Sequence, residues 1–335
     1  MNISKNVSLR RYNTFGMEAT ARLFTELLDT IQLPELADNY PPDDIFILGG
    51  GSNVLLTQDI NGLVILNRLK GIAIEKEDAH HAWIRVAAGE VWHDLVQYAI
   101  GNELGGIENL ALIPGTVGAS PIQNIGAYGV EVKETIEAVT CWHWQGKTFK
   151  TYSNTDCQFG YRDSIFKHSL KGKVLVTSVL FKLSKQPVLR TAYGAIIQEL
   201  EAMGVAPSVQ HIAQAVINIR SSKLPDPAKI GNAGSFFKNP TIPTAQYQEL
   251  LQRYPLLPSY PVSDDLVKIP AGWMIEQCGW KGKRIGDAGI HAKQSLVLVN
   301  YAHAKGDEIW QLSEQVVQSV QQSFGILLER EVQVW

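Results

Sequence analysis

A short apolar run that ends in consecutive glycines constrains this chain more than any other feature. Ile45–Leu48 has the length and composition of a buried β-strand. The residues that follow it are Gly49, Gly50, Gly51, Ser52 and Asn53. Without Cβ atoms, a backbone can adopt positive φ angles and turn several N–H groups toward one point, as a diphosphate site requires. A tight turn has the same composition, so the loop alone leaves both interpretations open.

Length and composition indicate a soluble protein with more than one domain. The chain has 335 residues, of which 45% are hydrophobic and 19% are charged. Its formal net charge of −3 favours neither nucleic acid nor an anionic membrane, and no apolar run has the length of a membrane span. Its three cysteines are widely spaced and fit neither a disulfide framework nor a metal site. We therefore expect a cytoplasmic protein without metal, nucleic acid or membrane partners.

The hydrophobic pattern predicts an α+β order of elements. Short β-branched runs favour strands at 45–48, 63–66, 71–75, 82–87, 136–151, 174–184, 295–299 and 326–334. Helical spacing favours helices at 91–100, 208–219, 244–254, 271–277 and 307–324. Ser208 is expected to cap one helix and Gly325 to end another. Strands and helices do not alternate regularly and no G-x-G-x-x-G motif follows a strand, which argues against a Rossmann domain. A change of composition around 221–234 predicts a domain boundary.

The stretch Gly105–Gly129 is irregular and yet apolar. Residues 110–129 include four glycines and two prolines among many apolar side chains. A solvated loop would be more polar, so we expect this segment to pack against something that satisfies its backbone groups. A large flat cofactor would do so. The placed polar contacts of such a site could come from Thr116, Ser120, Gln123 and Asn124.

Five ordered motifs resemble those of the UDP-N-acetylenolpyruvoylglucosamine reductase family. They are Gly49–Asn53, Ile113–Gly129, Gly160–Ser164, Gly231–Pro240 and Leu328–Val332. The resemblance extends from about Asn13 to the last residues. The family comprises cytoplasmic FAD enzymes of peptidoglycan precursor synthesis, which use NADPH to reduce an enolpyruvyl ether on UDP-N-acetylglucosamine. The resemblance implies the FAD-binding fold of the vanillyl-alcohol-oxidase-like (PCMH-type) superfamily, in two subdomains, plus a C-terminal α+β substrate-binding domain.

The resemblance also implies domain boundaries and a cofactor site. Residues 1–66 would form the first FAD-binding subdomain, joined by the C-terminal strand 326–335, with 67–219 as the second and 220–325 as the substrate-binding domain. No histidine follows the first loop in Val54–Thr57, so we expect FAD to be bound without covalent attachment. The implied FAD-binding residues are Gly49, Gly50, Gly51, Ser52, Asn53, Pro114, Gly115, Thr116, Gly118, Ala119, Ser120, Gln123, Asn124, Gly126, Ala127 and Tyr128.

The same resemblance implies that Arg162, Ser235 and Glu331 carry the reaction. Hydride arrival at C3 of the enolpyruvyl group leaves negative charge on C2 and its carboxylate, so a charge-stabilising group and a proton donor are needed. Arg162 and Glu331 would stabilise the charge, and Ser235 would give the proton to C2. A carboxyl helps here only if it is protonated or shares a hydrogen bond. Glu329, two positions earlier in the same expected strand, is the alternative to Glu331.

Further positions match substrate-binding residues of the family. They are Tyr161, Tyr193, Lys223, Asn239, Lys281 and Gln294. Tyr193 would lie on a mobile loop that closes over the nucleotide, which places the chain in the tyrosine-loop branch of the family. The implied partners are the enolpyruvyl sugar nucleotide and NADPH, and the family favours a monomer. Two other functions remain open: a related flavoprotein oxidase acting on a small alcohol or hydroxy acid, and a non-enzymatic module that binds flavin or a uridine nucleotide.

Overall fold

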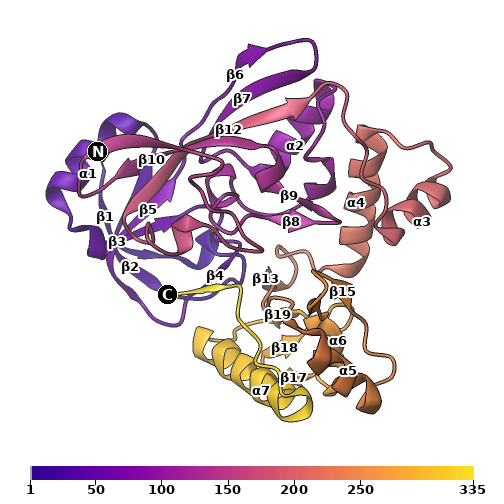
Figure 1. Cartoon of the computed structure of the whole chain (residues 1–335). Helices are drawn as coiled ribbons and strands as arrows, with labels where there is room; N and C mark the ends of the chain where they lie inside the picture. Colours follow the sequence, from indigo (N-terminus) through magenta and orange to yellow (C-terminus); the bar gives the residue numbers. More distant parts are fainter. Residues whose placement is uncertain (1) are drawn as a thin grey trace. The chain divides into compact units, whose positions relative to one another are not determined.

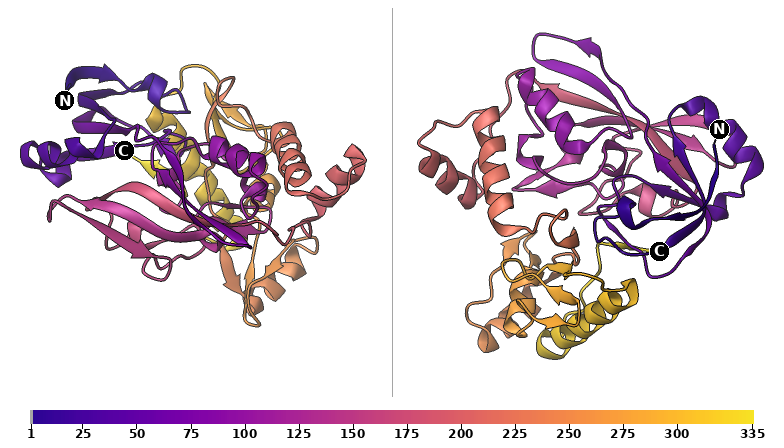
Figure 2. Two further views of the ribbon diagram at one scale, coloured as in Figure 1. Left: turned by 90° about the horizontal axis from the view of Figure 1, so that it is seen from above. Right: turned by 180° about the vertical axis from the view of Figure 1, so that it is seen from behind.

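The computed structural model describes residues 2–335, which form two compact units. Unit 1 comprises the residues up to Val7, Thr20–Gly50 and Ile60–Ser222. Unit 2 comprises Ser8–Ala19, Gly51–Asp59 and Lys223–Trp335. Figures 1 and 2 show the elements of each unit from three sides. Within 2–335, no helix combines the length and the apolar character that crossing a bilayer requires. The expected division into two FAD-binding subdomains and a substrate-binding domain stays a prediction.

The first sheet of unit 1 has the order β1-β2-β5-β3, and β5 runs parallel to both neighbours. Its strands are β1 (Ser4–Ser8), β2 (Thr20–Leu27), β3 (Ile45–Leu48) and β5 (Ile60–Asn67). Six of the eight residues of β5 form the continuous buried run 62–67, as is usual for a strand covered on both faces. Helix α1 (Leu33–Asn39) packs Leu33 and Leu36 into the same core.

The second sheet of unit 1 is antiparallel, with the order β11-β10-β12-β7-β6. Its strands are β6 (Ile72–Glu77), β7 (His81–Ala87), β10 (Ile136–His143), β11 (Thr148–Ser153) and β12 (Val174–Ser184). Helices α2 (Trp92–Gly101), α3 (Gly194–Met203) and α4 (Val209–Lys223) contribute to the core that this sheet covers. Trp92 of α2 meets Phe181 of β12 with ring centroids 5.9 Å apart. Figure 1 shows α3 and α4 side by side at one end of this unit.

Unit 2 is built from short strands and three helices. Its strands are β4 (Val54–Leu55), β13 (Gly231–Ser235), β14 (Thr241–Pro243), β15 (Tyr260–Pro261), β16 (Leu266–Lys268), β17 (Arg284–Ile285), β18 (Ala288–Ile290), β19 (Val297–Asn300) and β20 (Gln333–Val334). They form sheets of order β13-β19-β18-β17, β14-β16-β15 and β20-β4. The helices are α5 (Thr244–Arg253), α6 (Ala271–Gln277) and α7 (Gly306–Phe324). The buried face of α7 lies beside β18 and β19, as Figure 1 also shows.

Most of the remaining elements are short and lie within the irregular connections. They include the two-residue strands β8 (Gly126–Ala127) and β9 (Val130–Glu131), which pair with each other. The 3-10 turns are η1 (Arg10–Tyr12), η2 (Thr30–Gln32), η3 (Pro42–Asp44), η4 (Glu108–Leu110), η5 (Val117–Ala119), η6 (Val132–Glu134) and η7 (Ile165–Lys167). The stretch 105–129 is therefore irregular, as expected: it contains the turns η4 and η5, the short strand β8, and isolated bridges from Gly105 to Ser184 and from Thr116 to Val91.

Most predicted elements are present, and three are wrong in extent, one of them the helix predicted at 208–219, which continues to Lys223. The strands at 45–48 and 174–184 and the helix at 271–277 match the observed bounds. Ser208 accepts a hydrogen bond from the His211 N–H at 3.0 Å, and Gly325 ends α7 at φ = 68°. The single strand predicted at 136–151 is two strands, because a turn at 144–147 with Lys147 at positive φ reverses the chain. The strand predicted at 326–334 is reduced to Gln333–Val334.

Candidate active site

The first glycines of the Gly49–Asn53 loop lie against the second glycine-bearing segment, within unit 1. A Cβ placed on Gly49 would lie 2.6 Å from Oγ1 of Thr116. A Cβ on Gly50 would lie 2.9 Å from the Cα of Gly115. Both distances are too short for any side chain, so these glycines are required by the close approach of two segments that lie far apart in the sequence. The sequence analysis identified the two segments as separate features, and the structure shows that they lie side by side.

The loop also presents backbone donors. The N–H groups of Gly50, Gly51 and Ser52 donate no hydrogen bond to any residue in 2–335. Gly51 has φ = 61°, and a Cβ there would lie 2.0 Å from the carbonyl oxygen of Tyr12. A diphosphate binds to consecutive N–H groups that have no acceptor within the protein. A side chain at Gly50 or Gly51 would clash with neighbouring backbone. The loop therefore fits the diphosphate of a dinucleotide such as FAD.

The second segment is held by backbone bonds to the residues between β7 and α2. The Gly118 N–H donates to the Ala88 carbonyl at 2.9 Å, and the Trp92 N–H donates to the Gly115 carbonyl at 3.0 Å. A Cβ on Gly118 would lie 2.6 Å from the Cβ of Ala88. The irregular backbone is thus partly satisfied by the protein itself, which explains how an apolar loop can be buried before any ligand binds.

Two of the polar side chains expected to contact FAD are engaged inside the protein. Asn124 is fully buried and has φ = 43°. Its amide donates to Glu131 at 3.0 Å and to the Gly160 carbonyl at 2.8 Å, while its oxygen accepts from the Lys133 N–H at 3.1 Å. Ser120 donates its hydroxyl to the Val117 carbonyl at 2.8 Å. Both side chains therefore shape the segment, and any contact they make with FAD is limited to their remaining atoms.

Arg162 lies in a turn whose geometry directs its side chain toward the second segment. Its φ is 53°, and the turn is closed by reciprocal backbone bonds between Gly160 and Asp163. The guanidinium donates to the carbonyl oxygens of Gly126 and Asn124. It also lies 5.3 Å from the ring centroid of Tyr161. Within unit 1, Arg162 is therefore joined to the expected FAD segment through the backbone carbonyls of Asn124 and Gly126.

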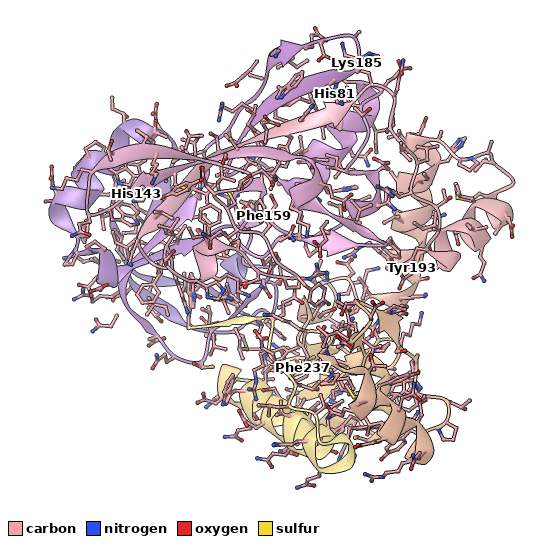
Figure 3. The ribbon with its side chains drawn as sticks, viewed as in Figure 1. His81, His143, Phe159, Lys185, Tyr193 and Phe237 are labelled. Atoms are coloured by element: carbon pink, nitrogen blue, oxygen red, sulfur yellow. The ribbon has the colours of Figure 1, made fainter. Side chains whose placement is uncertain are left out.

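Tyr193, labelled in Figure 3, precedes α3 and contacts the end of the FAD segment. Its ring meets that of Tyr128 edge to face, with centroids 5.4 Å apart. The buried amide of Asn109 links the same two regions, because it donates to the carbonyls of Tyr128 at 3.2 Å and Arg190 at 2.9 Å. Burial raises the pKa of the Tyr128 hydroxyl, and the charge of Arg220 acts in the opposite direction.

In unit 2, backbone bonds bring Glu331, Ser235 and Asn53 into one neighbourhood. The Glu331 N–H donates to the carbonyl of Phe236, the residue after Ser235, at 2.9 Å. The side-chain amide of Asn53 donates to the Glu331 carbonyl at 3.3 Å. Phe236 and Phe237, the latter labelled in Figure 3, are buried and exclude water from one side of this stretch. Ser235 and Glu331 belong to unit 2, whereas Arg162 belongs to unit 1.

The structure distinguishes the two candidate glutamates. The Glu329 side chain is 69% exposed and forms an ion pair with Lys238, whereas Glu331 is half-buried. The expectation that both project from one face of a strand is wrong, because residues 328–332 lie outside any strand and only Arg330 forms an isolated bridge, with Phe237. Glu329 is thus engaged at the surface, which favours Glu331 as the site residue.

The expected substrate-binding residues of unit 2 differ in their surroundings. Asn239 uses its side-chain oxygen to accept from the N–H of Ala271 at 2.9 Å, at the start of α6. Lys281 pairs with Glu276 at 2.8 Å, and the Gln294 oxygen accepts from the Leu296 N–H at 3.3 Å. Lys223 is exposed. Asn239 and Gln294 keep their amide nitrogens, and the Lys281 ammonium keeps further N–H donors, with which to contact a ligand.

The sequence analysis did not identify two polar residues near the site. Asn109 is buried and its side-chain oxygen accepts no hydrogen bond within 2–335. Arg220 has a buried Nε that donates none. A partial signal for Arg220 was present, because it lies three residues before Lys223, although the helix predicted at 208–219 ended before both residues and only α4 (Val209–Lys223) places them on one side. Asn109 gave no such signal, since its surroundings come from distant segments.

Two family models match the chain, in the order of the expected domains. The model of an FAD binding domain matches residues 38–152. The model described as UDP-N-acetylenolpyruvoylglucosamine reductase, C-terminal domain, matches residues 226–335. The first match contains both glycine-bearing segments, and the second contains Ser235 and Glu331. The expected FAD-binding fold with a C-terminal α+β domain is thus confirmed.

Curated proteins and a solved structure are similar to the chain over its full length. A UDP-N-acetylenolpyruvoylglucosamine reductase of Chromobacterium violaceum is 52% identical over 97% of both chains. One of Flavobacterium johnsoniae is 47% identical over 100% of both. The crystal structure of UDP-N-acetylenolpyruvylglucosamine reductase from Thermus caldophilus has a TM-score of 0.69 and 27% identity, covering 100% of this chain and 99% of that one.

Proposed function

Because the chain belongs to the UDP-N-acetylenolpyruvoylglucosamine reductase family, we propose that it reduces the enolpyruvyl group of that sugar nucleotide to give UDP-N-acetylmuramate. NADPH is the proposed hydride donor and FAD the bound cofactor. The observation that carries the proposal is similarity over at least 97% of both chains to relatives that bear this name. We further propose that the protein acts in the cytoplasm, as a monomer, in the synthesis of peptidoglycan precursors.

The two glycine-bearing segments are the proposed FAD site. The N–H groups of Gly50, Gly51 and Ser52 would hold the diphosphate, and Ile113–Gly129 would line the rest of the cofactor. FAD, when bound, supplies the transfer of hydride from NADPH to C3 of the substrate. Val54 and Leu55, which follow the loop, offer no nucleophile for covalent attachment, so the cofactor is proposed to be held by these contacts alone.

Ser235 is the proposed donor of the proton that C2 of the substrate receives. Its hydroxyl becomes an effective acid only where water is excluded and the charged carbon is close. The small neighbour Gly234, at φ = 71°, leaves room for close approach, and Phe236 and Phe237 are buried beside it. These features support the assignment of the proton transfer to Ser235.

Arg162 and Glu331 are proposed to stabilise the charge that develops on the substrate carboxylate. A guanidinium stays charged and matches the two oxygens of a carboxylate. Glu331 would act as a protonated acid or through a shared hydrogen bond, since an ionised carboxylate would repel this charge. The remaining substrate contacts are proposed for Tyr161, Tyr193, Lys223, Asn239, Lys281 and Gln294.

The test is a pair of measurements on the purified protein. We expect a yellow protein whose absorbance shows bound flavin, released on unfolding in acid. NADPH oxidation, followed by the loss of its near-ultraviolet absorbance, should require the enolpyruvyl sugar nucleotide and should produce UDP-N-acetylmuramate. The matched control replaces the sugar nucleotide by UDP-N-acetylglucosamine, which lacks the enolpyruvyl group.

The alternatives give different results. Rapid oxygen consumption with simple alcohols or hydroxy acids, without dependence on the sugar nucleotide, would indicate an oxidase. A colourless protein that still binds the uridine nucleotide would indicate a binding module. Either result would contradict the proposed reaction.

A further inference from the structure

The strand that carries Ser235 contains a β-bulge. Strand β13 pairs with β19 (Figure 1) so that Asn232 lies opposite Val299, and Ser235 lies opposite Val297. Three steps along β13 thus match two steps along β19, and Gly234, at φ = 71°, accommodates the extra residue. Because side chains alternate along a strand, one extra residue moves the side chains that follow it to the other face. The bulge therefore determines the face from which the Ser235 hydroxyl projects.

The side chain of Asn232 stabilises this bulge. It is buried, and its oxygen accepts from the Gly234 N–H at 3.0 Å. Its amide nitrogen donates to the carbonyls of Ile230 at 2.9 Å and Pro225 at 3.2 Å. Both hydrogens of the amide are thus used, and the side chain has one fixed orientation. A shift of Asn232 would move Gly234 and change the direction of Ser235.

Thr14 binds the backbone of Asn232 through two hydrogen bonds. The Asn232 N–H donates to the Thr14 carbonyl at 3.0 Å, and the Thr14 hydroxyl donates to the Asn232 carbonyl at 2.6 Å. The hydroxyl oxygen also lies 3.3 Å from the Gly51 carbonyl, which already accepts from the Thr14 N–H at 3.1 Å. A hydroxyl has one hydrogen, so we assign it to the shorter contact, with Asn232. Thr14 thus binds Asn232 with its side chain and Gly51 with its backbone.

Close backbone packing fixes the segment that carries Thr14, and all of these residues belong to unit 2. A Cβ on Gly51 would lie 2.0 Å from the carbonyl oxygen of Tyr12. A Cβ on Gly231 would lie 2.2 Å from the carbonyl oxygen of Phe15. Backbone therefore contacts backbone on both sides of the segment, which lies between the glycine loop and β13. A hydroxyl on so constrained a segment can hold its acceptor in one place.

We propose that Thr14 is a positioning residue for the proton transfer. Its hydroxyl holds the Asn232 carbonyl and, through the bulge, sets the direction of the Ser235 hydroxyl. The inference rests on the proposed function, in which Ser235 gives the proton to C2 of the substrate. The bond to Gly51 is made by the Thr14 backbone, so the side chain acts on the proton donor and not on the FAD loop. Thr14 lies outside the five motifs that resemble the family.

The first experiment measures both half-reactions of Thr14→Val by stopped-flow absorbance in the FAD-loaded protein. Valine keeps the branched shape and removes the hydroxyl. Reoxidation of the flavin by the substrate should slow by about tenfold or more, since a small misplacement of a reacting group has effects of this order. Flavin reduction by NADPH and FAD affinity should stay close to those of the wild type. Equal slowing of both half-reactions, or no slowing of reoxidation, would overturn the proposal.

Thr57→Val is the matched control. Thr57 is another half-buried threonine of unit 2, and its N–H and hydroxyl both donate to the Trp335 carbonyl, each at 2.8 Å. The substitution removes a bond of the same kind that is not directed at β13, so reoxidation should stay close to the wild-type rate. Thr14→Ser keeps the hydroxyl and should recover most of the rate lost in Thr14→Val. A serine variant as slow as the valine variant, or a control variant equally slow, would contradict a role for the hydroxyl.

The two substitutions should also be non-additive. In a Ser235→Ala background no hydroxyl remains to be positioned, so Thr14→Val should slow reoxidation little further. Full additivity would show that Thr14 does not act through Ser235, and the proposal would be wrong.

A last measurement does not depend on the substrate. Amide hydrogen exchange over residues 231–238 of the FAD-loaded protein should be about tenfold faster in Thr14→Val than in wild type or Thr57→Val, because the bulge loses one hydrogen bond that holds it. Unchanged exchange would overturn the proposal. A wild-type protein that holds FAD but does not reduce the enolpyruvyl substrate would contradict the proposed function, and exchange would still test whether Thr14 holds the bulge.

Discussion

The two regions that carry the proposed chemistry are held in place by different means. In unit 1, one buried and one half-buried side chain fix the segment Ile113–Gly129: Asn124 makes three hydrogen bonds, and Arg162 donates to two carbonyls. In unit 2, backbone bonds fix the stretch around Ser235, since the Glu331 N–H donates to Phe236 and the Lys238 N–H donates to Glu329. Both regions contain backbone bonds, but more side-chain hydrogen bonds fix the first, whereas the side-chain amides of Asn53 and Asn232 add to the backbone bonds of the second.

This difference separates stability from chemistry. A side chain of unit 1 that is removed leaves buried carbonyls or N–H groups without partners, which costs stability as well as function. In unit 2 the hydroxyl of Ser235 and the carboxyl of Glu331 can be changed while the backbone bonds remain. Substitutions in the second region should therefore report on the reaction itself, and those in the first on the integrity of the site.

The largest effect is expected from Ser235→Ala. Loss of the proton donor should slow reoxidation of the flavin by the substrate by about 10³- to 10⁴-fold, whereas reduction of the flavin by NADPH should stay close to normal. Stopped-flow absorbance of each half-reaction measures both. The melting temperature should change little. Equal slowing of the two half-reactions would show that Ser235 positions other groups and is not the donor.

The next largest effect is expected from Glu331→Gln. It should slow the same half-reaction by about 10²- to 10³-fold, since a positioned group that stabilises developing charge has effects of this order. Glu329→Gln is the matched control, because this exposed glutamate pairs with Lys238 at the surface. If the control slows the reaction and Glu331→Gln does not, the assignment of the catalytic glutamate is wrong by two positions.

Asn124→Ala should act on stability more than on the chemistry. It removes three buried hydrogen bonds and places alanine at a positive φ, so the free energy of unfolding should fall by about 3 kcal/mol or more. Ser120→Ala removes one hydrogen bond from the same segment and should cost about 1 kcal/mol. Urea unfolding of the apoprotein measures both. Similar costs for the two variants would argue against a segment held mainly by Asn124.

The sequence predicted the features that depend on local patterns, and it did not predict those that depend on contacts between distant segments. The glycine loop, the helices of unit 2 and the family motifs are local signals, and they led to the correct fold and family. The turn at 144–147 was missed because the apolar runs on its two sides read as one strand. The contact of Gly49 with Thr116 and the roles of Asn109 and Asn124 depend on distant segments, so no local pattern in the sequence contained them.

A moderate effect is expected from Asn109→Ala. Its amide joins the carbonyls of Tyr128 and Arg190, so its loss should loosen the loop that carries Tyr193. The KM for the sugar nucleotide should rise by about tenfold with a smaller change in kcat, in line with the loss of one or two buried hydrogen bonds. In a Tyr193→Ala background the same substitution should add little. Full additivity of the two substitutions would show that Asn109 does not act through Tyr193.

The smallest effect is expected on the stability of the turn that carries Arg162. The free energy of unfolding should depend on pH through Asp163 in this turn. Burial is the largest single influence on Asp163 and opposes its ionisation. The hydrogen bond and charge of His168, with the Ser164 N–H and the charge of Lys167, together outweigh burial and lower the pKa of the carboxyl below its usual 3.8. A depressed pKa means that Asp163 stabilises the fold at higher pH and that this contribution is lost as the pH falls through the folded-state pKa.

The pair is partly exposed, so Asp163→Asn should lower the free energy of unfolding by less than about 1 kcal/mol at pH 5, and the difference should vanish well below pH 3.8. Urea unfolding between pH 3 and 5 measures it. Glu329→Gln, in the region held by its backbone, provides the comparison. A difference between wild type and Asp163→Asn that stays constant with pH would show that the turn owes its stability to its backbone bonds as well.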